Sequence, residues 1–208
     1  MFVPLAEQTG LIAPLGNWAL REACKSLVGW VNRGGPSCTL AVNVSSPQIC
    51  PQFTRDIAAA LAATGLPPAQ LELEITESVL IGNADAALDC IAEWKRLGVQ
   101  VAVDDFGTGY SSLSYLSRLP VDRLKMDKAL IRGMTMDSRD ATIVRAVISL
   151  GRELGFTVLA EGVETEEQLD MLAALGCQQA QGYLFAVPAA ANEALAVMGR
   201  RWGARKAA

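Results

Sequence analysis

Two adjacent carboxylates, Asp104 and Asp105, stand between a short apolar run and a glycine-rich turn. The run at residues 101–103 is β-branched and apolar, which is typical of a buried strand bounded by turn residues. Two bare carboxylates at the end of such a strand are costly, and a bound cation is the usual remedy. For this stretch taken alone, an acidic turn without a ligand is the alternative, because Asp and Gly suit turns.

Polar side chains follow nearly every other predicted strand as well. They are two amides, one ammonium and two further carboxylates, at Asn43, Glu74, Lys125, Glu161 and Gln181. In parallel α/β folds the carboxyl ends of the strands gather at one rim, so these groups are expected to meet there. A ligand set of oxygen atoms without histidine or thiolate favours Mg²⁺ or Mn²⁺.

This set of groups indicates phosphodiester hydrolysis with two metal ions that share a bridging aspartate. Lys125 would orient or help to deprotonate the attacking water, since nearby cations depress the pKa of its ammonium group. The chain contains no histidine. That excludes a Ser-His-Asp triad, histidine-ligated zinc and a histidine-ligated iron phosphodiesterase site.

Alternating strands and helices must position these groups, and the alternation predicts an α/β fold with parallel pairing and right-handed crossovers. Strands are predicted at residues 39–45, 71–76, 101–104, within 122–127, at 157–160 and at 181–183. Helices are predicted at residues 14–30, 51–63, 84–97, 112–118, 140–154, 166–175 and 192–202, after a loop at 1–7. Glycines at 65, 98, 155 and 176 stand where helices are expected to stop.

Composition sets the class of protein. The 208 residues are 51% hydrophobic and show no shift in composition, which predicts one domain over residues 1–208. A net charge of −4 without a long basic run argues against duplex nucleic acid as a partner. The five scattered cysteines indicate a reducing compartment, and no run is apolar enough for a membrane segment or a signal peptide. A cytoplasmic location is therefore predicted.

Six short motifs together resemble the motif set of EAL domains, bacterial phosphodiesterases specific for cyclic di-GMP. In chain order they are Asn43-Val44-Ser45, Glu74-Ile75-Thr76-Glu77, Asp104-Asp105-Phe106-Gly107-Thr108-Gly109-Tyr110-Ser111-Ser112, Lys125-Met126-Asp127, Glu161-Gly162-Val163-Glu164-Thr165 and Gln181-Gly182-Tyr183. The resemblance implies a TIM-type (β/α) barrel that opens one ring phosphodiester bond of cyclic di-GMP to give linear pGpG.

The resemblance also implies roles for individual residues. One metal ion would be held by Asn43, Glu74 and Asp104, and the other by Asp104, Asp105 and Glu161. Lys125 would serve the nucleophilic water, with Gln181 beside it or the substrate. Substrate would further meet Asp127 and Glu164. Glu77 would anchor the loop at residues 106–112, which in the family couples dimerisation to metal binding, so a homodimer of the intact protein is implied.

The chain departs from the family pattern at its start. The Glu-Ala-Leu motif that names the family is absent, and residues 2–7 resemble the segment just downstream of it. We therefore expect the first two barrel strands, one glutamate ligand and one phosphate-binding arginine to be missing, with impaired hydrolysis. A fragment of a longer protein and a truncated member both remain open. The alternative function is an inactive EAL-like module that binds cyclic di-GMP or a partner protein.

Overall fold

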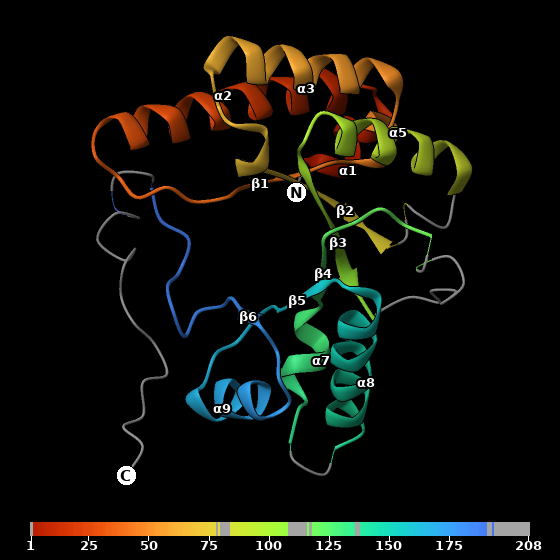
Figure 1. Ribbon diagram of the computed structural model, residues 1–208, viewed down its shortest axis with the longest axis vertical. Coiled ribbons are helices and arrows are strands. Elements are labelled where there is room, and N and C mark those ends of the chain that lie inside the picture. Colours follow the sequence, from red (N-terminus) through yellow and green to blue (C-terminus); the bar gives the residue numbers. More distant parts are fainter. Residues whose placement is uncertain are drawn as a thin grey trace. The chain divides into compact units, whose positions relative to one another are not determined.

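The computed structural model describes residues 2–77, 79, 84–107, 116, 118–135, 138–190 and 193 (Figure 1). In this part of the chain, six strands form one sheet in the order β1-β2-β3-β4-β5-β6. Strand β1 pairs with β2, β4 with β5, and β5 with β6, all in parallel. The predicted α/β fold with parallel strands is confirmed.

The chain divides into two compact units, residues 1–103 with 112–121, and residues 104–111 with 122–208. Strand β3 (Gln100–Phe106) begins in the first unit and ends in the second. The single domain predicted over residues 1–208 stays a prediction. None of the helices in the described ranges is both long and apolar enough to cross a membrane.

The first unit contains, in the described part of the chain, strands β1 and β2, the start of β3 and several helices. Its elements are α1 (Val3–Gln8), α2 (Ile12–Asn32), β1 (Leu40–Asn43), η1 (Ser46–Gln48), α3 (Pro51–Thr64), η2 (Pro68–Gln70), β2 (Leu71–Thr76) and α5 (Ala84–Arg96). Helices α2 and α3 lie side by side (Figure 1). Helix α3 starts with Pro51, where a missing N–H costs nothing, and stops at Gly65, whose φ of 70° is left-handed.

The core of the first unit joins these helices through Trp94 of α5, which is fully buried. Its ring packs edge-on against Phe53 of α3, with ring centroids 6.0 Å apart. Its Nε1 donates to Oγ1 of Thr54 at 3.0 Å, so the polar edge of the indole is satisfied inside the core. Nearby, Nδ2 of Asn17 on α2 donates to Oδ2 of Asp56 on α3 at 2.7 Å.

The second unit continues the alternation of strands and helices. Its elements after β3 are β4 (Arg123–Met126), α7 (Lys128–Arg132), α8 (Arg139–Leu154), β5 (Thr157–Ala160), α9 (Glu166–Ala174) and β6 (Gln179–Ala180). Oγ of Ser138 accepts from the Ala141 N–H at 3.0 Å and caps α8, which ends at Gly155 with a φ of 79°. Helix α8 packs closely on the sheet, because a Cβ at Gly151 would lie 2.3 Å from Cγ2 of Val158.

Two predictions of secondary structure need correction, and helix α7 was missed. Residues 1–7, predicted as a loop, contain helix α1; Pro4 stands in its first turn, where proline is tolerated. Helix α7 was not predicted, because five residues are too few for a helical periodicity. Strand β6 ends at Ala180, before the predicted residues 181–183, because the chain there pairs with Val163 instead. The helices predicted at 112–118 and 192–202 lie outside the described residues, apart from 116, 118 and 193.

Candidate metal centre

Strand β3 delivers Asp104 and Asp105 to one place through a break in its regular geometry. Side chains alternate between the faces of a regular strand, which would separate two neighbours. Asp105 has a φ of 54°, the one positive value among the described residues other than glycine. Asp tolerates this left-handed conformation better than most residues. The Asp105 N–H donates to Oδ1 of Asp104 at 3.0 Å, which ties the two residues together.

Glu161, which directly follows β5, completes a cluster with these two aspartates. Asp104, Asp105 and Glu161 each offer one carboxylate oxygen, and these three oxygens all lie within 4.8 Å of one another. Three carboxylates at this distance repel one another unless a cation lies among them. Carboxylate oxygens are the donors that Mg²⁺ and Mn²⁺ prefer, so the donor set fits such an ion.

Lys125 of β4 contacts two members of this cluster. Its Nζ lies 3.1 Å from Oδ1 of Asp104 and 2.8 Å from Oε1 of Glu161. The side chain of Lys125 is 5% exposed, and those of Asp104 and Glu161 are 13% and 17% exposed. Both contacts are therefore shielded from water, and a buried ammonium requires such partners. The Glu161 N–H donates to the Met126 carbonyl at 3.1 Å, which holds Glu161 beside the end of β4 that carries Lys125.

Asp127, the second residue after Lys125, interacts with the cluster electrostatically. Burial raises the pKa of the Asp105 carboxyl group, and the charge of Asp104, the charge of Asp127 and a hydrogen bond with Asp127 raise it further. The ammonium of Lys125 acts in the opposite direction. Oδ1 of Asp127 also accepts from the Ala129 N–H at 2.7 Å, so this side chain caps α7 while it faces Asp105.

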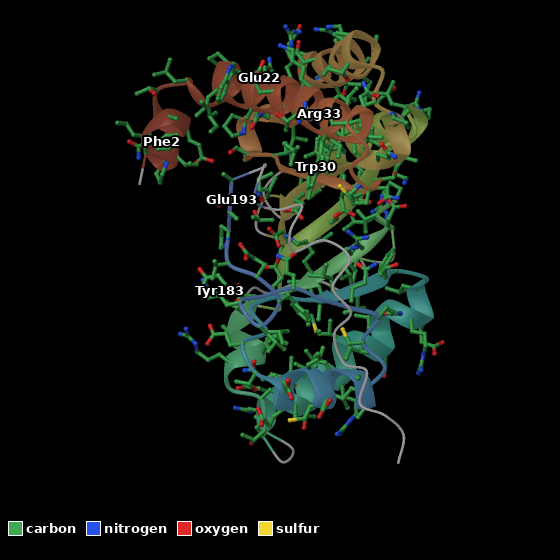
Figure 2. The ribbon with its side chains drawn as sticks, turned by 90° about the vertical axis from the view of Figure 1, so that its left-hand side faces the viewer. Phe2, Glu22, Trp30, Arg33, Tyr183 and Glu193 are labelled. Atoms are coloured by element: carbon green, nitrogen blue, oxygen red, sulfur yellow. The ribbon has the colours of Figure 1, made fainter. Side chains whose placement is uncertain are left out.

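Gln181 joins the cluster from the segment after β6. Its Nε2 donates to Oε1 of Glu161 at 2.8 Å, the same oxygen that Lys125 contacts. Tyr183, two residues further on, is 64% exposed and projects outward (Figure 2). Glu164, which was expected to line the pocket, is exposed and lies outside the carboxylate cluster.

The remaining predicted ligands belong to the first unit. Asn43 of β1 and Glu74 of β2 are register partners, and the Val44 N–H donates to the Glu74 carbonyl at 2.8 Å. Glu74 is buried, as are Glu72 and Glu77 on either side of it. The metal ion that Asn43 and Glu74 would share with Asp104 stays a prediction. The loop that Glu77 would anchor lies outside the described residues, apart from 106 and 107.

Gln168 of α9 is a supporting residue that was not predicted. Its Oε1 accepts from the N–H groups of Glu164 at 2.8 Å and Thr165 at 3.1 Å, and its Nε2 donates to the Ile131 carbonyl at 3.2 Å. The segment after β5 is thereby tied to the end of α7. The Thr-x-x-Gln spacing at 165–168 is a capping-box signal that predicts the local part of this arrangement.

The sequence of the chain is similar to those of known proteins over most of its length. Residues 1–188 match the family described as EAL domain. The chain is 46% identical over 201 residues to the uncharacterized protein y4lL of Sinorhizobium fredii. It is 45% identical over 196 residues to MucR of Pseudomonas aeruginosa, named a bifunctional diguanylate cyclase/cyclic di-GMP phosphodiesterase. These matches cover 96% and 94% of the chain but only 24% and 29% of the two relatives.

Solved structures agree with the sequence matches. The MucR phosphodiesterase, determined as a complex with c-di-GMP, superposes with a TM-score of 0.88 at 44% identity, over 93% of this chain and 78% of that one. Klebsiella pneumoniae BlrP1, determined as a manganese/cy-diGMP complex, gives a TM-score of 0.73 at 33% identity, over 83% of this chain and 45% of that one.

Proposed function

The chain belongs to the EAL domain family, and from this membership we propose that it hydrolyses cyclic di-GMP to linear pGpG with divalent metal ions. We propose that this hydrolysis is impaired in residues 1–208, because they do not contain the Glu-Ala-Leu motif. The observation that carries the proposal is the convergence of Asp104, Asp105 and Glu161, with their oxygens within 4.8 Å, on the buried ammonium of Lys125. Names of relatives support the substrate, since MucR is named a cyclic di-GMP phosphodiesterase. We further propose that residues 1–208 act as a single domain of this type.

We propose Mg²⁺ or Mn²⁺ as the cofactor. Asp104, Asp105 and Glu161 would hold one ion, and Asn43, Glu74 and Asp104 would hold the other. Bound ions of this kind stabilise the charge that develops on phosphoryl oxygens and lower the pKa of bound water. The manganese complex of BlrP1 supports this choice, although a calcium complex of the same protein also matches this chain.

The side chains of this protein would position the attacking water and the carboxylates around it. Lys125 is proposed to hold that water at Nζ, since its ammonium already lies between Asp104 and Glu161. Gln181 would fix the orientation of the Glu161 carboxylate through its 2.8 Å hydrogen bond. Substrate contacts are proposed for Asp127 and Glu164. Glu77 is proposed to anchor the loop that links the site to a homodimer interface.

A cytoplasmic location is proposed on the state of the cysteines. All five are free thiols, at Cys24, Cys38, Cys50, Cys90 and Cys177. Burial raises the pKa of the thiol in Cys24, Cys38, Cys90 and Cys177, which makes these groups poor nucleophiles at neutral pH. Unpaired cysteines of this kind are usual in a reducing compartment.

Binding without cleavage is the second candidate function. Lys125 contacts the carboxylates of Asp104 and Glu161 directly, so this part of the cluster is balanced electrostatically even without a metal ion. A protein that only recognises cyclic di-GMP could therefore keep these residues.

One assay separates the two functions. The purified chain is incubated with cyclic di-GMP and Mn²⁺, products are separated by chromatography, and nucleotide binding is measured in parallel. Hydrolysis to pGpG that is lost in Asp104→Asn and on chelation of the metal supports the enzyme. The matched control is Glu153→Gln, a carboxylate on α8 that is 76% exposed. Binding of the nucleotide with no pGpG above the Asp104→Asn level contradicts the proposed hydrolysis.

A further inference from the structure

We infer that Gly182 is a positioning residue for Glu161. At this position the segment after β6 packs against the segment after β5 so closely that no side chain fits between them. This inference rests on the proposed role of Glu161 as a metal ligand. Gly182 itself touches neither the carboxylate cluster nor Lys125 through a side chain, so its effect must pass through the main chain.

Main-chain hydrogen bonds hold the two segments together beyond the ends of their strands. The Gln181 N–H donates to the Ala160 carbonyl at 2.9 Å and continues the ladder between β5 and β6. The Val163 N–H donates to the Gln181 carbonyl at 3.0 Å, and the Leu184 N–H donates to the Val163 carbonyl at 3.0 Å. Both main-chain polar groups of Val163, which is fully buried, are therefore bound by residues on either side of Gly182.

Only glycine fits between these two hydrogen bonds. A Cβ at position 182 would lie 2.2 Å from the carbonyl oxygen of Val163, 2.3 Å from its nitrogen and 2.8 Å from its carbonyl carbon. All three are main-chain atoms, which cannot rotate away as the end of a flexible side chain would. Any other residue at this position must separate the two segments.

The segment after β5 cannot simply retreat, because α7 and α9 hold its other side. A Cβ at Gly162 would lie 2.4 Å from Cβ of Lys128, so this residue is already in close contact with α7. Gln168 accepts from the main-chain N–H groups of Glu164 and Thr165 and donates to the Ile131 carbonyl. An added methyl group at 182 must therefore disturb either Val163 or the neighbouring Gln181.

Either displacement reaches the carboxylate of Glu161. Glu161 lies two residues before Val163, and its Oε1 accepts from Nε2 of Gln181, the residue directly before Gly182. The same oxygen lies 2.8 Å from Nζ of Lys125. Hydrogen bonds of this length weaken steeply when their geometry is disturbed, and metal ligands must be held to within about 0.5 Å. Loss of the close contact at Gly182 should therefore weaken metal binding at Glu161.

The test compares Gly182→Ala with Gly176→Ala in the full chain. Gly176 has a φ of 82° and no atom within 4 Å of a built Cβ, so its substitution strains the backbone without a clash. Hydrogen exchange of the Val163 and Leu184 amides in the metal-free protein reports on the main-chain contact. Calorimetric titration with Mn²⁺ reports on its consequence. We expect faster exchange at both amides and about a 10- to 100-fold weaker Mn²⁺ affinity in Gly182→Ala, as for lost ligand support elsewhere, beyond any change in Gly176→Ala.

A double-mutant cycle shows whether Gly182 acts through Glu161. In a Glu161→Gln background, Gly182→Ala should cause little further loss of Mn²⁺ affinity, because the carboxylate that it positions is already gone. A loss as large as in the wild-type background would overturn the inference, as would exchange and Mn²⁺ affinity in Gly182→Ala equal to those of Gly176→Ala. A merely structural effect would lower stability in both backgrounds alike.

Two results keep the inference separate from the proposed function. If Gly182→Ala does not fold, the wild-type protein decides: Mn²⁺ should slow exchange at Val163 and Leu184, and unchanged exchange in Mn²⁺ would contradict the coupling. If the wild-type protein binds no Mn²⁺, the proposed function fails. The exchange comparison between the two alanine variants then decides whether Gly182 holds the Val163 segment.

Discussion

Nζ of Lys125 lies 2.8 Å from Oε1 of Glu161, and both groups come from the carboxyl ends of adjacent parallel strands. The ammonium neutralises a carboxylate that is proposed to bind metal. Lys125 balances part of the acidic cluster, and it is also proposed to hold the attacking water. The first task concerns the ground state, and the second concerns the transition state.

Replacing Lys125 with alanine separates these tasks. Since water activation acts on the transition state, Lys125→Ala should lower turnover by roughly 10²- to 10⁴-fold while cyclic di-GMP affinity changes little. Turnover is followed as pGpG formation with Mn²⁺, and affinity is measured by calorimetry. The control is Lys25→Ala, whose side chain is 61% exposed. Equal losses of affinity and rate would show that Lys125 anchors the phosphate instead.

Removing Asp104 should abolish metal binding. Asp104 is the proposed bridging ligand of two ions, so Asp104→Ala should leave no high-affinity Mn²⁺ binding in a calorimetric titration. The matched variant Glu153→Gln should bind Mn²⁺ as the wild type does, because Glu153 is exposed on α8. Identical Mn²⁺ isotherms for wild type and Asp104→Ala would refute the assignment of this cluster.

The raised pKa of Asp105 predicts a pH dependence of stability without metal. The folded protein keeps a proton on Asp105 above the usual aspartate pKa of about 3.9, where the unfolded chain has lost it. The free energy of unfolding should therefore fall as the pH rises from the pKa of Asp105 in the unfolded chain to its higher pKa in the folded protein. Mn²⁺ affinity should rise over the same window, because the ion requires the carboxylate. Denaturant titrations at several pH values give the free energy of unfolding as a function of pH. This free energy should fall less steeply with pH in Asp105→Asn than in the wild type. An unchanged slope would contradict the assignment.

The Trp94 hydrogen bond predicts a loss of stability in the first unit. Thr54→Val keeps the side-chain shape but removes the acceptor of the Trp94 indole N–H. Trp94 is fully buried, so its N–H is left without a partner in the core. An unsatisfied buried donor costs about 1–3 kcal/mol, so the free energy of unfolding in urea should fall by that amount. Thr142→Val, at an exposed helical position of α8, should change it much less. A loss in Thr54→Val no larger than in this control would show that the hydrogen bond contributes little.

Regular elements with strong end signals were predictable from the sequence. The strands at residues 71–76 and 157–160 have the predicted bounds. Helices α3 and α8 stop at Gly65 and Gly155 as expected, because glycine alone adopts a left-handed cap without cost. Neighbouring residues along the chain determine such features, so they can be predicted from the amino-acid sequence alone.

Features that depend on tertiary contacts were not predictable in the same way. The end of β6 at Ala180 follows from main-chain hydrogen bonds with Val163, which lies in another segment. The left-handed conformation of Asp105 had no signal in the hydrophobic pattern of its strand. The candidate site shows the same division. Strand ends indicated which residues could meet. The hydrogen bond of Gln168 with the Ile131 carbonyl and the close approach of Gly182 to Val163, in contrast, require the folded chain.

The Mn²⁺ dependence of pGpG formation in wild type and Glu161→Gln tests the central claim most directly, because it links the carboxylate cluster to catalysis in one measurement. We predict that the wild-type rate, although impaired, rises with Mn²⁺ and saturates. Glu161→Gln should need about 10-fold or more Mn²⁺ for half-maximal rate, or show no measurable rate, since a carboxylate ligand is lost. Formation of pGpG with the same Mn²⁺ dependence in both proteins, or its absence in the wild type at every Mn²⁺ concentration, would contradict the account.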